Sequence, residues 1–161
     1  MLLTRLANID DMELYFFWAN DPNVRKNAFS CNQIPWDIHQ KWFTEKLADR
    51  NSFLYVIENN GHAIGQVRFD IIDDKAEIGY SMDKECRGKG YGLNMLNAAI
   101  DSFTADMGKH AEVMTLVAKV RENNIPSNKI FTGAGFDNKN KNENIIVYEF
   151  NLDSSKKNEC L

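Results

Sequence analysis

A short glycine-rich turn, Arg87-Gly88-Lys89-Gly90-Tyr91-Gly92, is the stretch whose residue types and spacing most directly indicate chemistry. Glycine adopts backbone conformations that other residues avoid and adds no side chain, so successive amide N–H groups can converge on one anion. A helix that begins here would add the positive end of its dipole, and Arg87 and Lys89 add full positive charge. The turn therefore predicts a diphosphate site. The alternative is a glycine turn that only joins a strand to a helix.

The spacing of these glycines excludes the two best-known phosphate loops. No Gly-Lys-Ser/Thr closes a Walker loop, and the spacing Gly-x-Gly-x-Gly differs from the Rossmann pattern Gly-x-Gly-x-x-Gly. Arg-x-x-Gly-x-Gly after a strand instead resembles the pyrophosphate loop of the GNAT acyl-CoA N-acetyltransferases. Asn124-x-x-Ser127, followed by Gly135-Phe136, is similar to a second segment of that family and stands in the expected order.

This resemblance implies a fold and a set of residues that bind acetyl-CoA. The fold is α+β, with a central mixed and mostly antiparallel sheet, a splayed pair of strands and flanking helices. The pantetheine arm lies between the splayed strands and pairs with strand amides. Carried over to this chain, the coenzyme-binding residues are Tyr80, Ser81, Met82, Arg87, Gly88, Lys89, Gly90, Tyr91, Gly92, Asn124 and Ser127. Asn124 also suits a helix N-cap, and it can serve in both ways.

Acetyl transfer from a thioester needs a neutral amine, a polarised carbonyl and a proton for the departing thiolate. Glu77 resembles the position from which many family members use a carboxylate as base; a solvent-facing strand residue is the alternative. The usual acid is a tyrosine, at the place where this chain has Phe131. Tyr91 or Tyr80 would then supply the proton, or the thiolate leaves unaided. Glu77 and Tyr91 are the predicted catalytic residues, and no metal is expected.

The acceptor side is predicted from two segments, Trp18 to Arg25 (WANDPNVR) and His39 to Phe43 (HQKWF). They resemble a branch that acetylates the 4-amino group of nucleotide-linked deoxysugars, as in the pseudaminic acid pathway. Similar Trp-x-Asn-Asp-Pro segments occur in the branch that acts on ribosomal protein N-termini. The predicted substrate-binding residues are Arg25, Lys26, Phe29 and His39, with charge for phosphates and a ring for a base. The alternatives are a solvated loop, a core position for Phe29, and a surface histidine.

Three functions follow from these segments. The first is transfer of acetyl from acetyl-CoA to a UDP-4-amino-4,6-dideoxy sugar or a related nucleotide-activated amino sugar. The second is acetylation of peptide N-termini, and the third is a non-catalytic acyl-CoA-binding module, which the missing tyrosine at position 131 would explain. The expected partner is a small molecule rather than nucleic acid or membrane, and a homodimer is left open.

Composition is that of one globular domain. The chain has 161 residues, with 19 basic and 23 acidic side chains and a net charge of −4, which argues against a broad nucleic-acid or anionic-membrane surface. Cys31, Cys86 and Cys160 lack metal-type spacing, so reduced thiols and a cytoplasmic location are expected. No signal peptide or apolar run of membrane length is recognised. We expect one domain over residues 1–152 and a flexible tail over 153–161.

The elements that position these residues follow from periodicity and turn signals. Strands are predicted over 2–9, 52–57, 63–69, 75–82, 113–120 and 144–152. Helices are predicted over 10–20, 36–47 and from the glycine turn to about 107, with a short helix inside 121–136 and a polar loop over 24–35. The three central strands read as an antiparallel meander. The strand before the glycine turn and the strand over 113–120 flank a helix, so they should run parallel.

Overall fold

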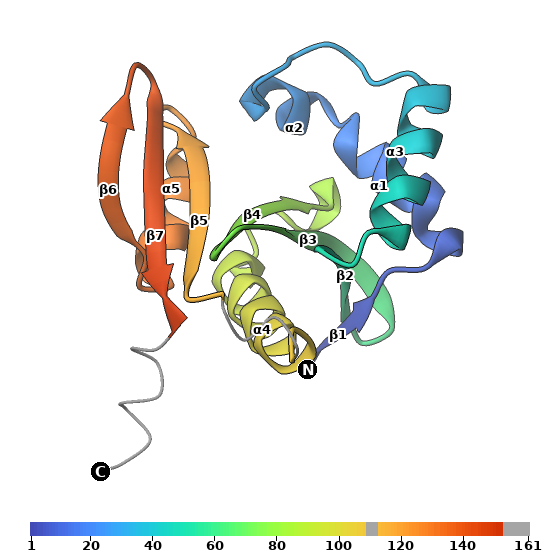
Figure 1. Cartoon of the computed structure of the whole chain (residues 1–161). Helices are drawn as coiled ribbons and strands as arrows, with labels where there is room; N and C mark the ends of the chain where they lie inside the picture. The colour runs from blue at the N-terminus through green and yellow to red at the C-terminus, as the bar shows by residue number, and fades with distance from the viewer. Residues whose placement is uncertain (109–112, 153–161) are drawn as a thin grey trace.

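The computed structural model describes residues 1–108 and 113–152, which build one seven-stranded sheet with helices on both faces (Figure 1). The strand order is β1-β2-β3-β4-β5-β7-β6, and all neighbours are antiparallel except β4 and β5. The strands are β1 Leu2–Leu6, β2 Ser52–Asn59, β3 His62–Ile72, β4 Lys75–Met82, β5 Thr115–Arg121, β6 Asp137–Asn142 and β7 Ile145–Asn151. The helices are α1 Met12–Ala19, α2 Pro22–Asn27, α3 Trp36–Ala48, α4 Tyr91–Asp106 and α5 Ile125–Gly133, with 3-10 turns at Ile9–Asp11 and Lys84–Cys86. Within these residues, no helix is both long enough and apolar enough to cross a bilayer.

Strand β2 shows why both faces of the sheet are covered. Tyr55 and Ile57 face the cluster built on α4, whereas Leu54 and Val56 face a second cluster with α1 and α3. Successive side chains of a strand point to opposite faces, so these four buried residues need a partner layer on each side. The helices therefore divide into two layers with the sheet between them.

Helix α4 supports the sheet from one face. Its buried residues recur at three- and four-residue steps, and the ring of Phe103 stacks on Phe69 of β3 at 4.2 Å between centroids. Burying one such side chain contributes roughly 1.5–3 kcal/mol. This packing fixes the N-terminal end of α4, which carries the glycine turn, at the carboxyl end of β4.

Strands β4 and β5 form the predicted splayed pair. They pair only at Lys75 with Thr115, Ala76 with Leu116 and Glu77 with Val117. Beyond Glu77, β4 continues beside β3 and β5 continues beside β7, so the two strands separate. We call this opening the fork; its closed end is at Glu77 and its open end at Met82 and Arg121.

Two local expectations were wrong. Residues 24–27, expected in a polar loop, belong to helix α2, because Asp21 caps this helix and Pro22 is at its first turn. Strand β6 was missed because all six of its residues are polar and exposed, and it lies at the edge of the sheet beside β7. The expected tail over 153–161 lies outside the described residues.

Candidate active site

The glycine turn has the geometry of an anion site. Gly88 has a φ of 72° and Gly90, the N-cap of α4, a φ of 78°, in the left-handed region that favours glycine. A Cβ at either position would meet nothing within 4 Å, so glycine is needed here for conformation and not for space. The first turn of the 16-residue helix α4 has no acidic side chain. The exposed amide end of this helix therefore fits a diphosphate.

Gly92 has a different role from the other two glycines. It is buried, and a Cβ there would collide with the side chain of Ile130 on α5. The missing side chain lets the first turn of α4 approach α5 closely. Gly92 thus sets the distance between two helices that flank the fork.

Arg87 turns its guanidinium away from the turn. Its Nε and Nη2 donate to the carbonyl oxygen of Met82 at 3.1 and 2.9 Å, and its Nη1 lies 2.9 Å from Oδ1 of Asp21. Lys89 is exposed, and no ion pair engages it within the described part of the chain. Of the two basic residues predicted to bind the diphosphate, Lys89 is the one whose charge is free to do so.

A pair of hydroxyls spans the fork. Tyr80 of β4 points to α5, and its hydroxyl lies 2.8 Å from Oγ of Ser127. Burial raises the pKa of Tyr80, and the hydrogen bond with Ser127 offsets part of that rise, so the phenol is protonated at neutral pH. Asn124 caps α5, because its Oδ1 accepts from the amide of Ser127 at 3.4 Å. The N-cap role considered for Asn124 is confirmed.

Tyr91, the predicted acid, points elsewhere. Its hydroxyl accepts a hydrogen bond from Nδ2 of Asn59, at the end of β2 and two strands away from β4. Phe131, at the position where the family's usual acid was expected, is only 2% exposed and packs against Tyr80 and Tyr148. Tyr80 is therefore the tyrosine hydroxyl that the structure places across the fork.

Glu77 lies at the closed end of the fork on the face of the sheet opposite to α4. Its Oε2 is 2.7 Å from Nζ of Lys119 on β5, and both side chains are partly exposed. Ser81 lies on the same face of β4 and accepts a hydrogen bond from Nε2 of Gln66 at 3.0 Å. The predicted base thus lies on the side of the sheet that α1 and α3 cover.

Residues 18–34, which we call the strap, connect α1 to α3 through α2. Nε1 of Trp18 donates to Oδ2 of Asp83 at 3.0 Å, just after β4. Asp21 caps α2 and also forms the ion pair with Arg87. Burial by itself would raise the pKa of Asp21, but the hydrogen bonds from Arg87 and from the α2 amides hold it below its usual value. The strap is thereby tied to the glycine turn.

The polar residues of the segment from Trp18 to Arg25 mostly stabilise the strap itself. Asn20 donates to the carbonyl of Ile34 and accepts from its amide, at 3.1 and 2.8 Å. Arg25 donates to the carbonyls of Ala19, Ser30 and Asn32. These residues therefore hold the strap in its conformation, and their presence in the sequence does not by itself show that the acceptor is a sugar.

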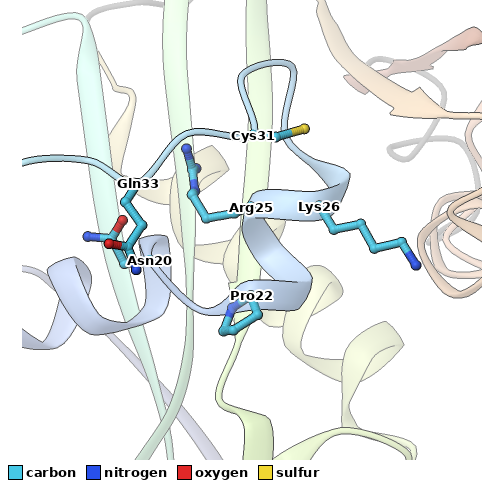
Figure 2. A pocket seen from close by; sticks show the side chains of 6 residues that line it. All are labelled: Asn20, Pro22, Arg25, Lys26, Cys31 and Gln33. Atoms are coloured by element: carbon cyan, nitrogen blue, oxygen red, sulfur yellow. The ribbon is translucent and has the colours of Figure 1, made fainter.

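A pocket of about 430 Å³ opens beside α2 (Figure 2). Its lining residues are Asn20, Pro22, Arg25, Lys26, Cys31 and Gln33. Lys26 points away from Arg25 in Figure 2, and within the described residues no carboxylate pairs with either. Phe29, which follows α2, is 57% exposed, so the alternative of a core position is excluded. Two of the four predicted substrate residues, Arg25 and Lys26, thus line this pocket.

His39 is the exception and corrects the prediction. It is 1% exposed and packs among Phe16, Trp42 and Phe43, with Nε2 2.9 Å from the carbonyl oxygen of Met12. Burial lowers its pKa, with partial compensation from the Met12 carbonyl. His39 joins α1 to α3 and cannot touch an acceptor. Its position on the helix face next to Phe43 was a sequence signal for this role.

Two residues of this region were not predicted to have a role. Asp21 could have been recognised as a helix cap, since it precedes Pro22. Arg121 had no sequence signal: its Nε and Nη2 donate to the carbonyl oxygen of Ala28, 93 residues earlier, at 3.2 and 2.9 Å. In residues 1–108 and 113–152, no three His, Cys, Asp or Glu side chains gather where they could hold a metal ion.

Comparison with known sequences identifies relatives along most of the chain. The family described as acetyltransferase (GNAT) domain matches residues 1–137. The uncharacterized N-acetyltransferase p20 of Bacillus licheniformis is 30% identical over 168 residues, which cover 94% of this chain and 92% of the relative. An uncharacterized protein of Methanocaldococcus jannaschii is 26% identical over 94% of this chain, but this chain spans only 31% of its length.

Solved structures share the fold and contain the coenzyme. Spermidine N-acetyltransferase of Vibrio cholerae, in complex with CoA and spermine, has a TM-score of 0.80 at 17% identity, covering 94% of this chain and 96% of that one. The aminoglycoside acetyltransferase AAC(6')-Ib with coenzyme A has 0.81 at 15%, covering 99% of both. Campylobacter jejuni PseH with acetyl coenzyme A has 0.70 at 17%, covering 94% and 99%. The predicted fold class is confirmed, and acetyl-CoA is the cosubstrate that goes with this family.

Proposed function

Because this chain belongs to the GNAT acetyltransferase family, we propose that it transfers acetyl from acetyl-CoA to the 4-amino group of a nucleotide-linked deoxyamino sugar. Acetyl-CoA-dependent transfer to an amine follows from the family and from the glycine turn at the fork. The nucleotide sugar goes beyond that and rests on the charge of the strap.

The observation that supports this acceptor is the positive charge of the strap pocket. Arg25 and Lys26 line it, and neither has a carboxylate partner in the described residues. Like charges repel, so a polycation such as spermine or an aminoglycoside is disfavoured here. A nucleotide diphosphate brings two negative phosphates that Arg25 and Lys26 can hold, while Phe29 offers a ring for the base.

The residues around the fork can then carry out the transfer. The thioester of acetyl-CoA supplies the activated acetyl group. Glu77 accepts a proton from the incoming amine, directly or through water, so that the nitrogen lone pair can attack the carbonyl carbon. The free strand edge of Tyr80 to Met82 offers amides to the coenzyme. When the carbon–sulfur bond breaks, the hydroxyl of Tyr80 gives its proton to the thiolate, and water restores the proton of Tyr80, directly or through the hydroxyl of Ser127.

A panel of acceptors tests this function. Release of CoA is measured with a UDP-4-amino-4,6-dideoxy sugar, spermine, an aminoglycoside and a peptide with a free N-terminus. We expect turnover with the nucleotide sugar. Lys26→Gln should raise its KM and weaken its salt dependence, whereas Lys139→Gln on β6, far along the sheet, should change neither. Turnover of the peptide alone would reject the sugar and favour N-terminal acetylation.

A second candidate, a non-catalytic acyl-CoA-binding module, is favoured by one observation. Phe131 cannot donate a proton and is buried in the core. This candidate predicts tight binding of CoA without turnover of any amine in the panel. We also propose a cytoplasmic location, because Cys31 and Cys86 are free thiols and the cytoplasm keeps thiols reduced. A homodimer stays a prediction for a mass measurement in solution.

A further inference from the structure

Arg121 connects the β5 side of the fork to the strap. It is the last residue of β5, and its two hydrogen bonds to Ala28 reach the C-terminal end of α2. In residues 1–108 and 113–152, no other hydrogen bond or ion pair joins the strap to β5 or α5. Figure 1 shows α2 above the separating ends of β4 and β5.

The opposite end of the strap is held by other side chains. Trp18 bonds Asp83 and Asp21 pairs with Arg87, both on the β4 side of the fork. Helix α2 has only six residues, and a helix this short is not stable by itself in water. Its position therefore depends on its anchors, which are the Asp21 cap at one end, Arg121 at the other, and the hydrogen bonds of Arg25 within the strap.

We propose that Arg121 is a positioning residue for the acceptor. By holding the carbonyl of Ala28, it fixes α2 and with it Arg25 and Lys26 relative to the fork. That these side chains receive the acceptor rests on the function proposed above, whereas the tie itself does not. Two N–H groups of the rigid, planar guanidinium of Arg121 donate to the same carbonyl oxygen, so the geometry of this group matters more than its charge.

Hydrogen exchange tests the tie without any acceptor. In Arg121→Gln, amide exchange over residues 24–31 should become roughly tenfold faster than in the wild-type chain, since the end of α2 is released. Lys139→Gln is the matched control, because it also removes one charge from the C-terminal strands while leaving Arg121 in place. Unchanged exchange over 24–31 in Arg121→Gln would overturn the proposal.

Kinetics test the consequence for the acceptor. Arg121→Gln should raise the KM of the UDP-4-amino-4,6-dideoxy sugar about tenfold while kcat changes less. The Kd of acetyl-CoA from calorimetry should stay within about twofold, because the Asp21–Arg87 side is intact. An unchanged acceptor KM, or an equally large loss of acetyl-CoA affinity, would contradict a positioning role.

Arg121→Lys separates geometry from charge. Lysine keeps the positive charge but cannot place two donors on one carbonyl, so its KM should stay well above the wild-type value. Full recovery in Arg121→Lys would mean that the charge acts on the acceptor directly, and would overturn the proposal. If the wild-type chain acetylates no nucleotide sugar, the proposed function fails, and the exchange result by itself decides whether Arg121 positions α2.

Discussion

The hydroxyl of Tyr80 on β4 lies 2.8 Å from Oγ of Ser127 on α5, so a hydrogen bond spans the fork where β4 and β5 no longer pair. This pair places a protonated phenol beside the path expected for the pantetheine arm. The ring of Tyr80 contacts Phe131, so a strand residue places a hydroxyl next to the position where the helix has none.

Replacing Tyr80 tests the proton donor. Tyr80→Phe should lower kcat roughly 10- to 100-fold, because the thiolate then leaves without a proton, while the affinity for acetyl-CoA changes little. Steady-state rates of CoA release and a calorimetric titration measure both. Tyr91→Phe is the matched comparison, since it removes the hydroxyl that bonds Asn59. A larger loss of kcat in Tyr91→Phe than in Tyr80→Phe would indicate that Tyr91 is the proton donor.

Replacing Glu77 tests the base. Glu77→Gln should lower the rate most at low pH, where the free amine is scarcest, and a pH–rate profile measures this. Lys119→Gln keeps the carboxylate but removes its ion-pair partner at 2.7 Å, so its effect should be smaller. A wild-type pH–rate profile in Glu77→Gln would count against proton removal by this residue.

The two glycines at the start of α4 should respond differently to substitution. Gly90→Arg should abolish binding of CoA, because it strains a φ of 78° and places a long side chain beside the anion site. Gly92→Ala should instead cost about 1 kcal/mol of unfolding free energy, since its Cβ displaces Ile130. Calorimetry with CoA and thermal unfolding separate the two effects. Unchanged affinity in Gly90→Arg would contradict the assignment of the turn.

His39 should make stability depend on pH. Its pKa in the folded chain is below the ordinary value of 6.5, so the unfolded chain binds the extra proton first. The stability that neutral His39 contributes is complete above about pH 6.5 and is lost as the pH falls towards the lower folded pKa. Unfolding by denaturant at pH 8, 6.5 and 5.5 measures this loss in the wild-type chain.

The control for His39 is a variant that cannot titrate. His39→Phe should remove most of that pH dependence while leaving the KM of the acceptor unchanged, because the ring is buried between α1 and α3. A raised KM without a change in the pH profile would mean that residue 39 acts on substrate after all.

Much of the fold was predictable because it is encoded locally. Strand β4 was predicted with its observed bounds, and the parallel pairing of β4 with β5 was also predicted. Their signals are alternation, turn residues and one connecting helix, all within a short stretch of chain. Strand β6 was not predicted, because neither of its faces is apolar and it forms only through its pairing with β7.

The sequence by itself determined the family, the bounds of β4 and the parallel pairing of β4 with β5, since these depend on local patterns and on one connecting helix. Only the tertiary structure decided which side chains meet. It paired Glu77 with Lys119 and Arg121 with Ala28, 42 and 93 residues apart, and buried His39 between two helices. The physical reason is that a side chain's partner depends on how distant elements pack, and local periodicity carries no record of that packing.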